Sequence, residues 1–178
     1  MLFCAILNVI MIKGAMLMTQ YHNIPPVYDK NSRILILGSF PSVKSREAQF
    51  FYGHPQNRFW KVMSAVLDCE CPVTKEEKKL MLLSHNIAVW DVIGSCEITG
   101  SSDATISSVV PNDIAGLVAE TSVTRIFANG ATSYNMYKRY CRDNVGIEAV
   151  KLPSTSPANA AFSLERLISE WKSQILSQ

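Results

Sequence analysis

The chain has 178 residues, of which 48% are hydrophobic and 18% are charged, and it contains no internal repeat or low-complexity tract. This length allows one sizeable buried core and leaves little room for a second domain. The formal net charge of +2 excludes a uniformly basic protein, so any contact with a polyanion has to come from a local cluster of Lys and Arg.

The first nineteen residues are almost wholly apolar, with Asn8 and Lys13 as the exceptions. The apolar run is too short to span a bilayer, has no basic leading segment and is followed by no clear cleavage site. We therefore expect neither a membrane anchor nor a signal peptide. We interpret residues 1–19 as an apolar extension, with the natural start near Met16 or Met18, and residues 20–178 as a single domain.

The five cysteines are odd in number and widely spaced, in a domain large enough to fold without disulfides. This pattern favours a reducing cytoplasm. Cys69 and Cys71 could be half of a metal site, but no second Cys/His pair has the spacing of a zinc or iron–sulfur site. We expect no metal and no cofactor.

The predicted elements begin with a strand over residues 33–37, a continuous apolar run typical of a parallel strand buried on both faces. A helix follows over 58–67. A second helix is predicted over 75–83, because Thr74 and Glu77 match a capping box at its start.

The middle of the chain repeats this alternation. A second apolar run over 87–92 predicts a buried strand, and Pro111 is suited to open the next helix. A third strand is predicted over 124–128, followed by a helix over 131–141.

The last strand is predicted over 146–152 and is ended by Pro153. A C-terminal helix follows, with Ser163 suited to be its N-cap. Its apolar stripe consists of Leu164, Leu167, Ile168, Trp171 and Ile175. Strands and helices that alternate in this way indicate an α/β protein with a parallel sheet covered by helices on both faces.

Four polar segments follow the predicted strands. Ligands of open parallel sheets bind beyond the carboxyl ends of the strands, where the connecting loops converge. These segments are rich in Gly, Pro, Ser and Asn, which form tight turns that present N–H groups and hydroxyls to a polar ligand. They are residues 38–42, Asp91 with its neighbours, Asn129 with Gly130, and residues 152–159.

The stretch 50–61 is more specific and reads Phe-Phe-Tyr-Gly-His-Pro-Gln-Asn-Arg-Phe-Trp-Lys, downstream of a Gly-x-x-Pro turn. Through these residues the chain resembles the uracil-DNA glycosylase superfamily, in particular the branch with mismatch-specific uracil and thymine glycosylases and hypoxanthine-DNA glycosylases. The Leu-Pro-Ser-Thr-Ser-Pro-Ala-Asn segment is similar to the second motif of that superfamily. The resemblance covers roughly residues 33–162 and implies a three-layer α/β/α sandwich around a four-stranded parallel sheet.

One position departs from the superfamily pattern. Many members carry an Asn or an acidic residue in the first motif, where it orients the attacking water, and the matching position here is Phe40. A first motif without that Asn or acidic residue is most similar to the hypoxanthine-DNA glycosylase family. In that family we expect an Asn of the second segment to take over the role of this residue. That residue is Asn57, whose carboxamide could hold the water or hydrogen-bond the base. Alternatively, Asn57 caps the helix that begins at residue 58.

The resemblance also implies a pocket for a base that has left the helical stack. Tyr52 matches the stacking ring of relatives, with Phe51 as the alternative, although either could be core. Asp91 falls where relatives carry a base-reading side chain, and a carboxylate there could accept the N1–H that hypoxanthine has and adenine lacks. A helix or turn cap is the competing role of Asp91. The backbone N–H groups of Ser39 and Phe40 could bond a base carbonyl.

Hydroxyl groups, loop residues and basic side chains near these motifs are expected to contact the DNA strand. For residues 152–159 the alternative is that an ordinary helix starts at residues 156–157. A second basic cluster, Lys138 with Arg139 and Arg142, fits better as a solvated helix face. The expected DNA-contacting residues are Ser42, Lys44, Arg58, Asn129, Gly130, Ser154, Thr155, Ser156 and Asn159.

We therefore predict a monomeric, monofunctional DNA-deoxyinosine glycosylase that hydrolyses the N-glycosidic bond of a deaminated base. One alternative is a uracil-DNA or mixed-specificity glycosylase of the same fold. Another is a noncatalytic module that senses lesions, which the aromatic residue in the first motif makes conceivable.

Overall fold

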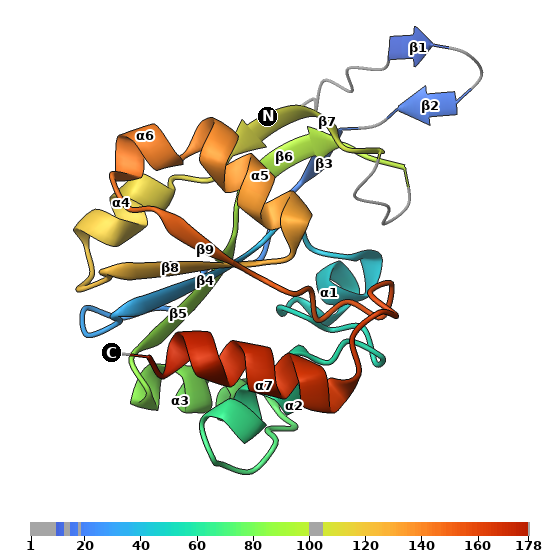
Figure 1. The fold of residues 1–178 in the computed structure, drawn as a ribbon. Helices are drawn as coiled ribbons and strands as arrows, with labels where there is room; N and C mark the ends of the chain where they lie inside the picture. Colours follow the sequence, from blue (N-terminus) through green and yellow to red (C-terminus); the bar gives the residue numbers. More distant parts are fainter. Residues whose placement is uncertain (1–9, 13–14, 18, 100–104, 178) are drawn as a thin grey trace, which may run out of the picture.

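The computed structural model describes residues 10–12, 15–17, 19–99 and 105–177. Its centre is a four-stranded, fully parallel sheet in the order β5-β4-β8-β9. Helices lie above and below this sheet, which gives three layers (Figure 1). The strands are β4 (Ile34–Gly38), β5 (Ile87–Asp91), β8 (Arg125–Asn129) and β9 (Ala149–Leu152).

The strands read as continuous apolar runs because both faces of the sheet are buried. Successive side chains of a strand point to opposite faces. In β4, Ile36 belongs to the apolar cluster on one face, whereas Leu35 and Leu37 belong to the cluster on the other. All three are fully buried.

Three helices cover one face of the sheet, seen below it in Figure 1. They are α2 (Phe59–Val66), α3 (Lys75–Ser84) and α7 (Leu164–Ile175). The capping box predicted at Thr74 and Glu77 forms, and Ser163 caps α7 as expected. The aromatic residues Phe59 and Trp171 join α2 to α7 through an edge-to-face contact of 5.9 Å between ring centroids.

The other face is covered by α4 (Ile114–Ala119), α5 (Ala131–Tyr140) and the short α6 (Arg142–Val145). A helix over residues 43–48, α1 (Val43–Ala48), lies in the connection between β4 and α2. It was not predicted, because its six residues carry no apolar stripe long enough to be recognised.

A second, antiparallel sheet in the order β3-β6-β7 was not predicted either. Its strands are β3 (Thr19–Tyr21), β6 (Ile93–Glu97) and β7 (Ser107–Pro111). Two further strands, β1 (Ile10–Ile12) and β2 (Ala15–Leu17), pair with each other. The rest of the predicted apolar extension over residues 1–19 lies outside the described residues, apart from Thr19 in β3.

The helix predicted to open at Pro111 is wrong. Pro111 ends β7, where it lies opposite Ile93, and α4 begins only at Ile114 with Asp113 as its N-cap. Proline fixes its own φ near a value that suits both a first helical turn and a strand end, so the residue alone could not decide. The last strand is also shorter than predicted, because Gly146 (φ 74°) ends α6.

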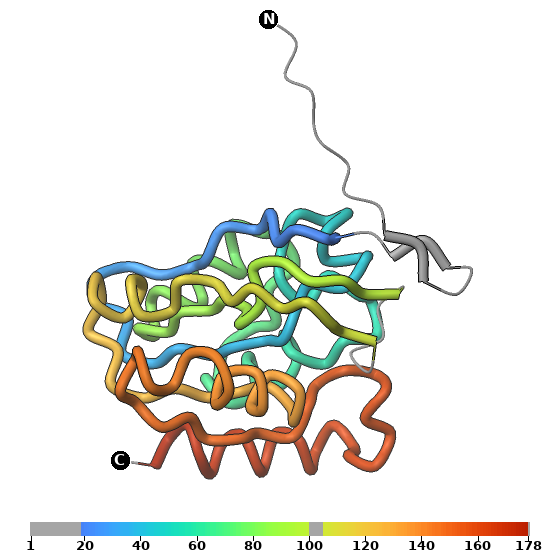
Figure 2. The backbone as a smooth tube through the Cα atoms, turned by 90° about the horizontal axis from the view of Figure 1, so that it is seen from above, coloured from blue at the N-terminus to red at the C-terminus, as the bar shows by residue number. Residues whose placement is uncertain are grey.

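The segment after β3 runs along the β5 edge of the parallel sheet, while α7 lies on the far side of the molecule in the view from above (Figure 2). Val27 forms an antiparallel bridge with Val89 of β5, with two backbone hydrogen bonds of 2.9 and 3.0 Å. The residues before Val27 are thereby fixed beside the carboxyl end of β5.

Candidate active site

A pocket of about 130 Å³ lies at the carboxyl edge of the parallel sheet, where the four polar segments meet. Its volume suits a single heterocyclic base rather than a base pair. The expected site residues among its lining are Ser39, Phe40, Ser42, Phe51, Tyr52, Asn57, Asp91, Asn129, Ser154, Thr155 and Ser156. Lys44, Arg58, Gly130 and Asn159 are not part of the lining.

Asn57 is held in a single orientation by hydrogen bonds to its side-chain oxygen. Its Oδ1 accepts from the backbone N–H of Phe59 at 3.0 Å and from the hydroxyl of Thr155 at 3.0 Å. The Thr155 hydroxyl in turn accepts from Nδ2 of Asn129 at 2.9 Å. Because a backbone N–H can only donate, the oxygen of Asn57 must face Phe59, and this fixes which atom of the carboxamide is left for the pocket.

The side chain of Asn57 therefore contacts both the helix and the pocket, while its part in catalysis stays a prediction. Its oxygen caps the start of α2, and the side chain also lines the pocket. Both lone pairs of Oδ1 are occupied, so the group that remains for a ligand is the Nδ2 amide, a hydrogen-bond donor. This geometry favours a donor that acts on the base over an acceptor that holds the attacking water.

Tyr52 stacks its ring on Phe59, with 3.8 Å between centroids and an interplanar angle of 19°. Its backbone has φ 53°, a left-handed conformation that is uncommon for a residue with a bulky side chain. The buried hydroxyl forms no hydrogen bond of regular geometry with the described residues, although the amide of Asn129 lies close enough to affect its pKa. Burial strongly raises the pKa of this hydroxyl, the charge of Asp91 raises it further, and the neighbouring Asn129 lowers it. The hydroxyl therefore remains protonated and can donate.

Asp91 ends β5 and lies in the pocket with only 4% of its surface exposed. It packs against Gly38 so closely that a Cβ on that glycine would lie 2.0 Å from Asp91 Oδ1. The hydroxyl of Tyr52 would lie 3.3 Å from the same Cβ. Gly38 is therefore required so that the Asp91 carboxylate and the Tyr52 hydroxyl can meet at this edge.

His22 is a member of this site that the sequence did not reveal. Its Nε2 lies 2.8 Å from Oδ2 of Asp91, and the His22 side chain is 1% exposed. The imidazole contacts Phe40 and Phe51, with ring centroids 6.1 Å away in both cases. Since His22 lies outside every recognised motif and its partner is far along the chain, no sequence pattern could have connected the two.

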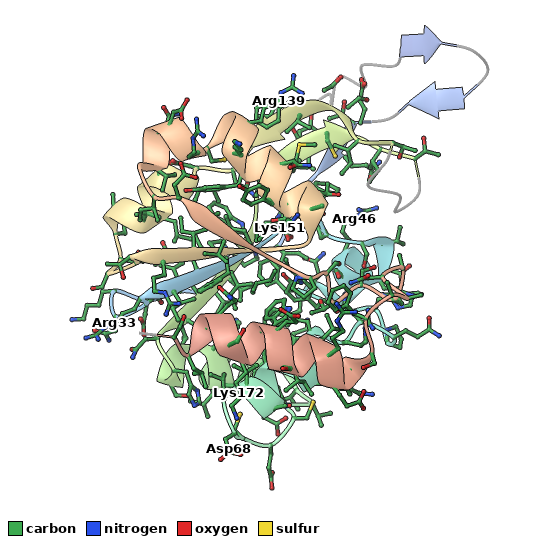
Figure 3. All side chains as sticks on the ribbon, in the orientation of Figure 1. Arg33, Arg46, Asp68, Arg139, Lys151 and Lys172 are labelled. Carbon is green, nitrogen blue, oxygen red and sulfur yellow. The ribbon has the colours of Figure 1, made fainter. Side chains whose placement is uncertain are left out.

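Phe40 and Phe51 are core residues as well as pocket walls, with 8% and 2% of their surfaces exposed. The guanidinium of Arg46 lies 5.6 Å from the centre of the Phe40 ring and donates to the carbonyl of Pro41 at 2.7 Å. Arg46 thereby stabilises the turn that follows β4, and Figure 3 places it on the α1 side of the molecule, at the opposite end of β4 from Arg33.

Arg58 organises the protein itself rather than lining the pocket. Its guanidinium donates to the carbonyls of Ser156 at 2.7 Å and Asn159 at 2.9 Å, and also to that of Phe162. Its Nε donates to the carbonyl of Thr155 at 3.4 Å. Backbone acceptors occupy this fork, so Arg58 holds the loop after β9 in place, and the phosphate contact expected from the sequence stays a prediction.

The loop after β9 has its own local bonds. The hydroxyl of Ser154 accepts from the N–H of Ser156 at 3.2 Å, and Nδ2 of Asn159 donates to the carbonyl of Ser154 at 2.9 Å. The residues after Ser156 form turns, so no helix starts there. Gly130 has φ 99° and lies so close to Ser154 that a Cβ would be 2.9 Å from it. Gly130 therefore allows this loop to approach β8.

Lys44, which was expected to contact DNA, and Arg142 of the second basic cluster each lie beside a carboxylate. Lys44 is exposed but lies 2.8 Å from Glu47, and Arg142 pairs with Asp143 at 2.9 Å. Figure 3 shows Arg139 over α5, on the other side of the molecule from α7. Neighbouring carboxylates therefore partly offset the positive charges of Lys44 and Arg142.

Within the described ranges, no helix is both long and apolar enough to cross a bilayer. The same residues include no group of three or more His, Cys, Asp or Glu side chains placed to hold a metal ion. Cys69 and Cys71, the pair considered as half of a metal site, are free and exposed.

Comparison with known proteins identifies the family. The model of the uracil DNA glycosylase superfamily matches residues 25–176. The chain belongs to the uracil DNA glycosylase superfamily. It is 38% identical over 149 residues to a hypoxanthine DNA glycosylase of Methanosarcina acetivorans, which covers 83% of this chain and 93% of that protein. A hypoxanthine DNA glycosylase of Methanosarcina barkeri is 32% identical over 149 residues, covering 83% and 92%.

A solved structure supports the same assignment. The solution NMR structure of a candidate uracil DNA glycosylase from Methanosarcina acetivorans has a TM-score of 0.75 and 34% sequence identity, and covers 88% of this chain and 96% of that one. The predicted α/β/α sandwich and the predicted superfamily are thus confirmed. The uracil DNA glycosylase match begins at residue 25, so His22 lies outside the matched region.

Proposed function

We propose that this protein is a DNA-deoxyinosine glycosylase that hydrolyses the bond between hypoxanthine and its sugar and leaves an abasic site in DNA. The superfamily, the two related hypoxanthine DNA glycosylases and the base-sized pocket support this function. The observation that carries it is the fixed carboxamide of Asn57, whose amide nitrogen remains for a ligand in that pocket.

Hydrolysis of an N-glycosidic bond places negative charge on the departing base and positive charge on the sugar. A donor that is already oriented toward the base stabilises the transition state more than the ground state, because it need not reorganise during the reaction. Asn57 is such a donor. Its orientation is fixed by Phe59 and Thr155 before any substrate binds.

The pocket is too small for a paired base, so the target nucleotide must leave the duplex. Phe51 offers apolar surface to the extruded base, and Asp91 offers an acceptor for its N1–H. No lysine is among the described residues that line the pocket. This composition favours attack by water over a Schiff base, and hence a monofunctional enzyme.

A substrate panel tests the proposal. Single-turnover release would be measured on matched duplexes that carry one hypoxanthine, uracil or xanthine. Hypoxanthine should be released fastest. Release of uracil with hypoxanthine left intact would instead establish the uracil-specific alternative.

Replacement of Asn57 distinguishes an enzyme from a lesion-sensing module. Asn57→Ala should lower hypoxanthine release by about 100-fold or more, the cost of a lost preorganised donor, while affinity for abasic DNA stays within about twofold. Wild-type protein that binds lesion DNA tightly without any release would establish the noncatalytic alternative. The monomeric state, the absence of metal and the cytoplasmic location remain predictions from the sequence.

A further inference from the structure

The protonation state of His22 follows from its two hydrogen bonds. The backbone N–H of Ile24 donates to Nδ1 of His22 at 3.3 Å, so Nδ1 carries no proton. The remaining proton is therefore on Nε2, which donates to Oδ2 of Asp91 at 2.8 Å. His22 is thereby a neutral donor fixed between the backbone and the carboxylate.

This contact determines what Asp91 can offer to a base. One carboxylate oxygen, Oδ2, is occupied by His22. The other, Oδ1, lies against Gly38 at the pocket edge. A buried carboxylate is strongly disfavoured as an anion unless donors compensate for the lost water, and the N–H of His22 is such a donor. The bond to His22 leaves Oδ1 as the carboxylate oxygen that can accept from a ligand.

A protonated donor lies beside that acceptor. The hydroxyl of Tyr52 and Oδ1 of Asp91 are both close to the same point above Gly38, at 3.3 and 2.0 Å from its hypothetical Cβ. The hydroxyl is buried and forms no hydrogen bond of regular geometry with the described residues. An unsatisfied buried donor of this kind costs stability, which is consistent with a bond that forms only when a ligand is bound.

An acceptor next to a donor matches the chemical change that deamination makes. Adenine presents a bare N1 beside an amino group, and cytosine presents a bare N3 beside an amino group. Deamination reverses both positions, so hypoxanthine and uracil present an N–H beside a carbonyl. Guanine and thymine share that edge, so such a pair separates deaminated bases from adenine and cytosine.

We propose that His22 is a specificity-determining positioning residue, which keeps Asp91 as an acceptor with only Oδ1 left for a ligand. Asp91 Oδ1 and the Tyr52 hydroxyl then together hydrogen-bond the N–H and carbonyl edge of a deaminated base. The inference rests on the proposed glycosylase function. It adds a residue from the N-terminal segment, outside the region matched by the family, to those that support the base pocket through Asp91.

The test uses variants that differ in whether they reach Asp91. His22→Phe removes the donor and keeps a ring between Phe40 and Phe51. His22→Gln places an amide N–H near the position of Nε2, whereas the amide of His22→Asn is too short to reach Asp91. His85→Phe, in which an exposed histidine far along the chain is replaced, is the matched control.

Base release would be measured under single-turnover conditions from duplexes with one hypoxanthine or adenine opposite an abasic analogue, so that base pairing does not contribute. We expect His22→Phe and His22→Asn to release hypoxanthine roughly 10- to 100-fold more slowly, as for a lost hydrogen bond to a buried charge, and to discriminate less against adenine. His22→Gln and His85→Phe should stay within about threefold of wild type.

Affinity for abasic DNA separates base reading from general structural damage. This ligand has no base to read, so its binding should be unchanged in the His22 variants while hypoxanthine release falls. Tyr52→Phe, which removes only the hydroxyl, should show the same pattern. If His22→Phe does not fold, the contrast between His22→Gln and His22→Asn decides the question.

The inference would be overturned if His22→Phe, or His22→Asn in its place, released hypoxanthine at the wild-type rate with unchanged adenine discrimination. It would also be overturned if base release and abasic-DNA affinity fell together. A wild-type protein that releases no base from any duplex would instead overturn the proposed function. The two failures are thus distinguishable.

Discussion

Asn57 shows how one side chain can serve the helix and the pocket at once. Its oxygen is held by Phe59 and Thr155, and only the amide nitrogen is left for chemistry. Asp at this position would keep the oxygen that caps α2 and replace the donor by a second acceptor. The two possible roles of Asn57, donor to the base or acceptor for water, therefore predict opposite results for the same substitution.

We expect Asn57→Asp to lower single-turnover hypoxanthine release by about 100-fold or more, because the preorganised donor is lost. The midpoint of thermal unfolding should change little, since the cap survives. Release at or above the wild-type rate would show that the side chain acts on water instead.

Gly38 gives a second prediction at this scale. A methyl group on Gly38 would lie 2.0 Å from Asp91 Oδ1, so Gly38→Ala must displace a carboxylate that is bonded to His22. We expect hypoxanthine release to fall by roughly tenfold or more, as for loss of a hydrogen bond to a charged group. Gly146→Ala is the control: its φ of 74° is unfavourable for alanine, but nothing lies within 4 Å of the added carbon. That variant should lose about 1–2 kcal/mol of stability and keep its activity.

Most single residues of the pocket could be predicted because they lie in motifs next to strand ends. Tyr52, Asn57 and Asp91 all line one pocket, as the rule for parallel sheets indicates. The partners of these residues could not be predicted. Contacts such as His22 with Asp91 depend on side-chain packing between distant segments, which periodicity and spacing do not encode.

At the scale of elements, the start of α2 is tied to the loop after β9. Arg58 precedes α2 and donates to carbonyls of four residues in or next to that loop, and Thr155 returns a hydrogen bond to Asn57. Two segments almost a hundred residues apart thus form one unit around the pocket. A change in the conformation of the loop after β9 should therefore also change the orientation of Asn57.

Arg58→Ala should therefore destabilise the fold and reduce hypoxanthine release. Loss of several hydrogen bonds from a charged donor should cost about 2–4 kcal/mol, which lowers the unfolding midpoint by about 5–15 °C in a protein of this size. Arg58→Lys should not restore it, because an ammonium cannot reproduce the planar fork. Lys61→Ala, which removes an exposed cation of α2, should leave the midpoint within about 2 °C. An unchanged midpoint in Arg58→Ala would contradict this role.

The parallel strands and the long helices were predicted because burial on both faces and capping leave local signals, as in β4 and at Thr74. The antiparallel β3-β6-β7 sheet left no such local signal in the sequence. Its strands are short, and β6 pairs with β7 through two irregularities in register, so no alternation of apolar and polar residues develops. Pro111, which the sequence alone could not assign to a helix start or a strand end, also lies in this sheet.

At the scale of the whole molecule, a net charge of +2 predicts modest electrostatic binding. If two to four phosphates are contacted, affinity for abasic duplex DNA should fall by roughly 10- to 150-fold between 50 and 200 mM salt. Fluorescence anisotropy over a salt titration measures this slope. A flat response would exclude phosphate contacts as a source of affinity, and a much steeper one would indicate more than four phosphate contacts.

The N-terminal segment along the β5 edge has a practical consequence for where the polypeptide is begun in the laboratory. Expression from residue 25, the first position matched by the family, would keep all four parallel strands and both apolar clusters almost whole. Such a shortened protein should melt cooperatively and pass as intact in routine quality checks. It would nevertheless lack the imidazole behind Asp91, and its choice among bases would be the property that suffers.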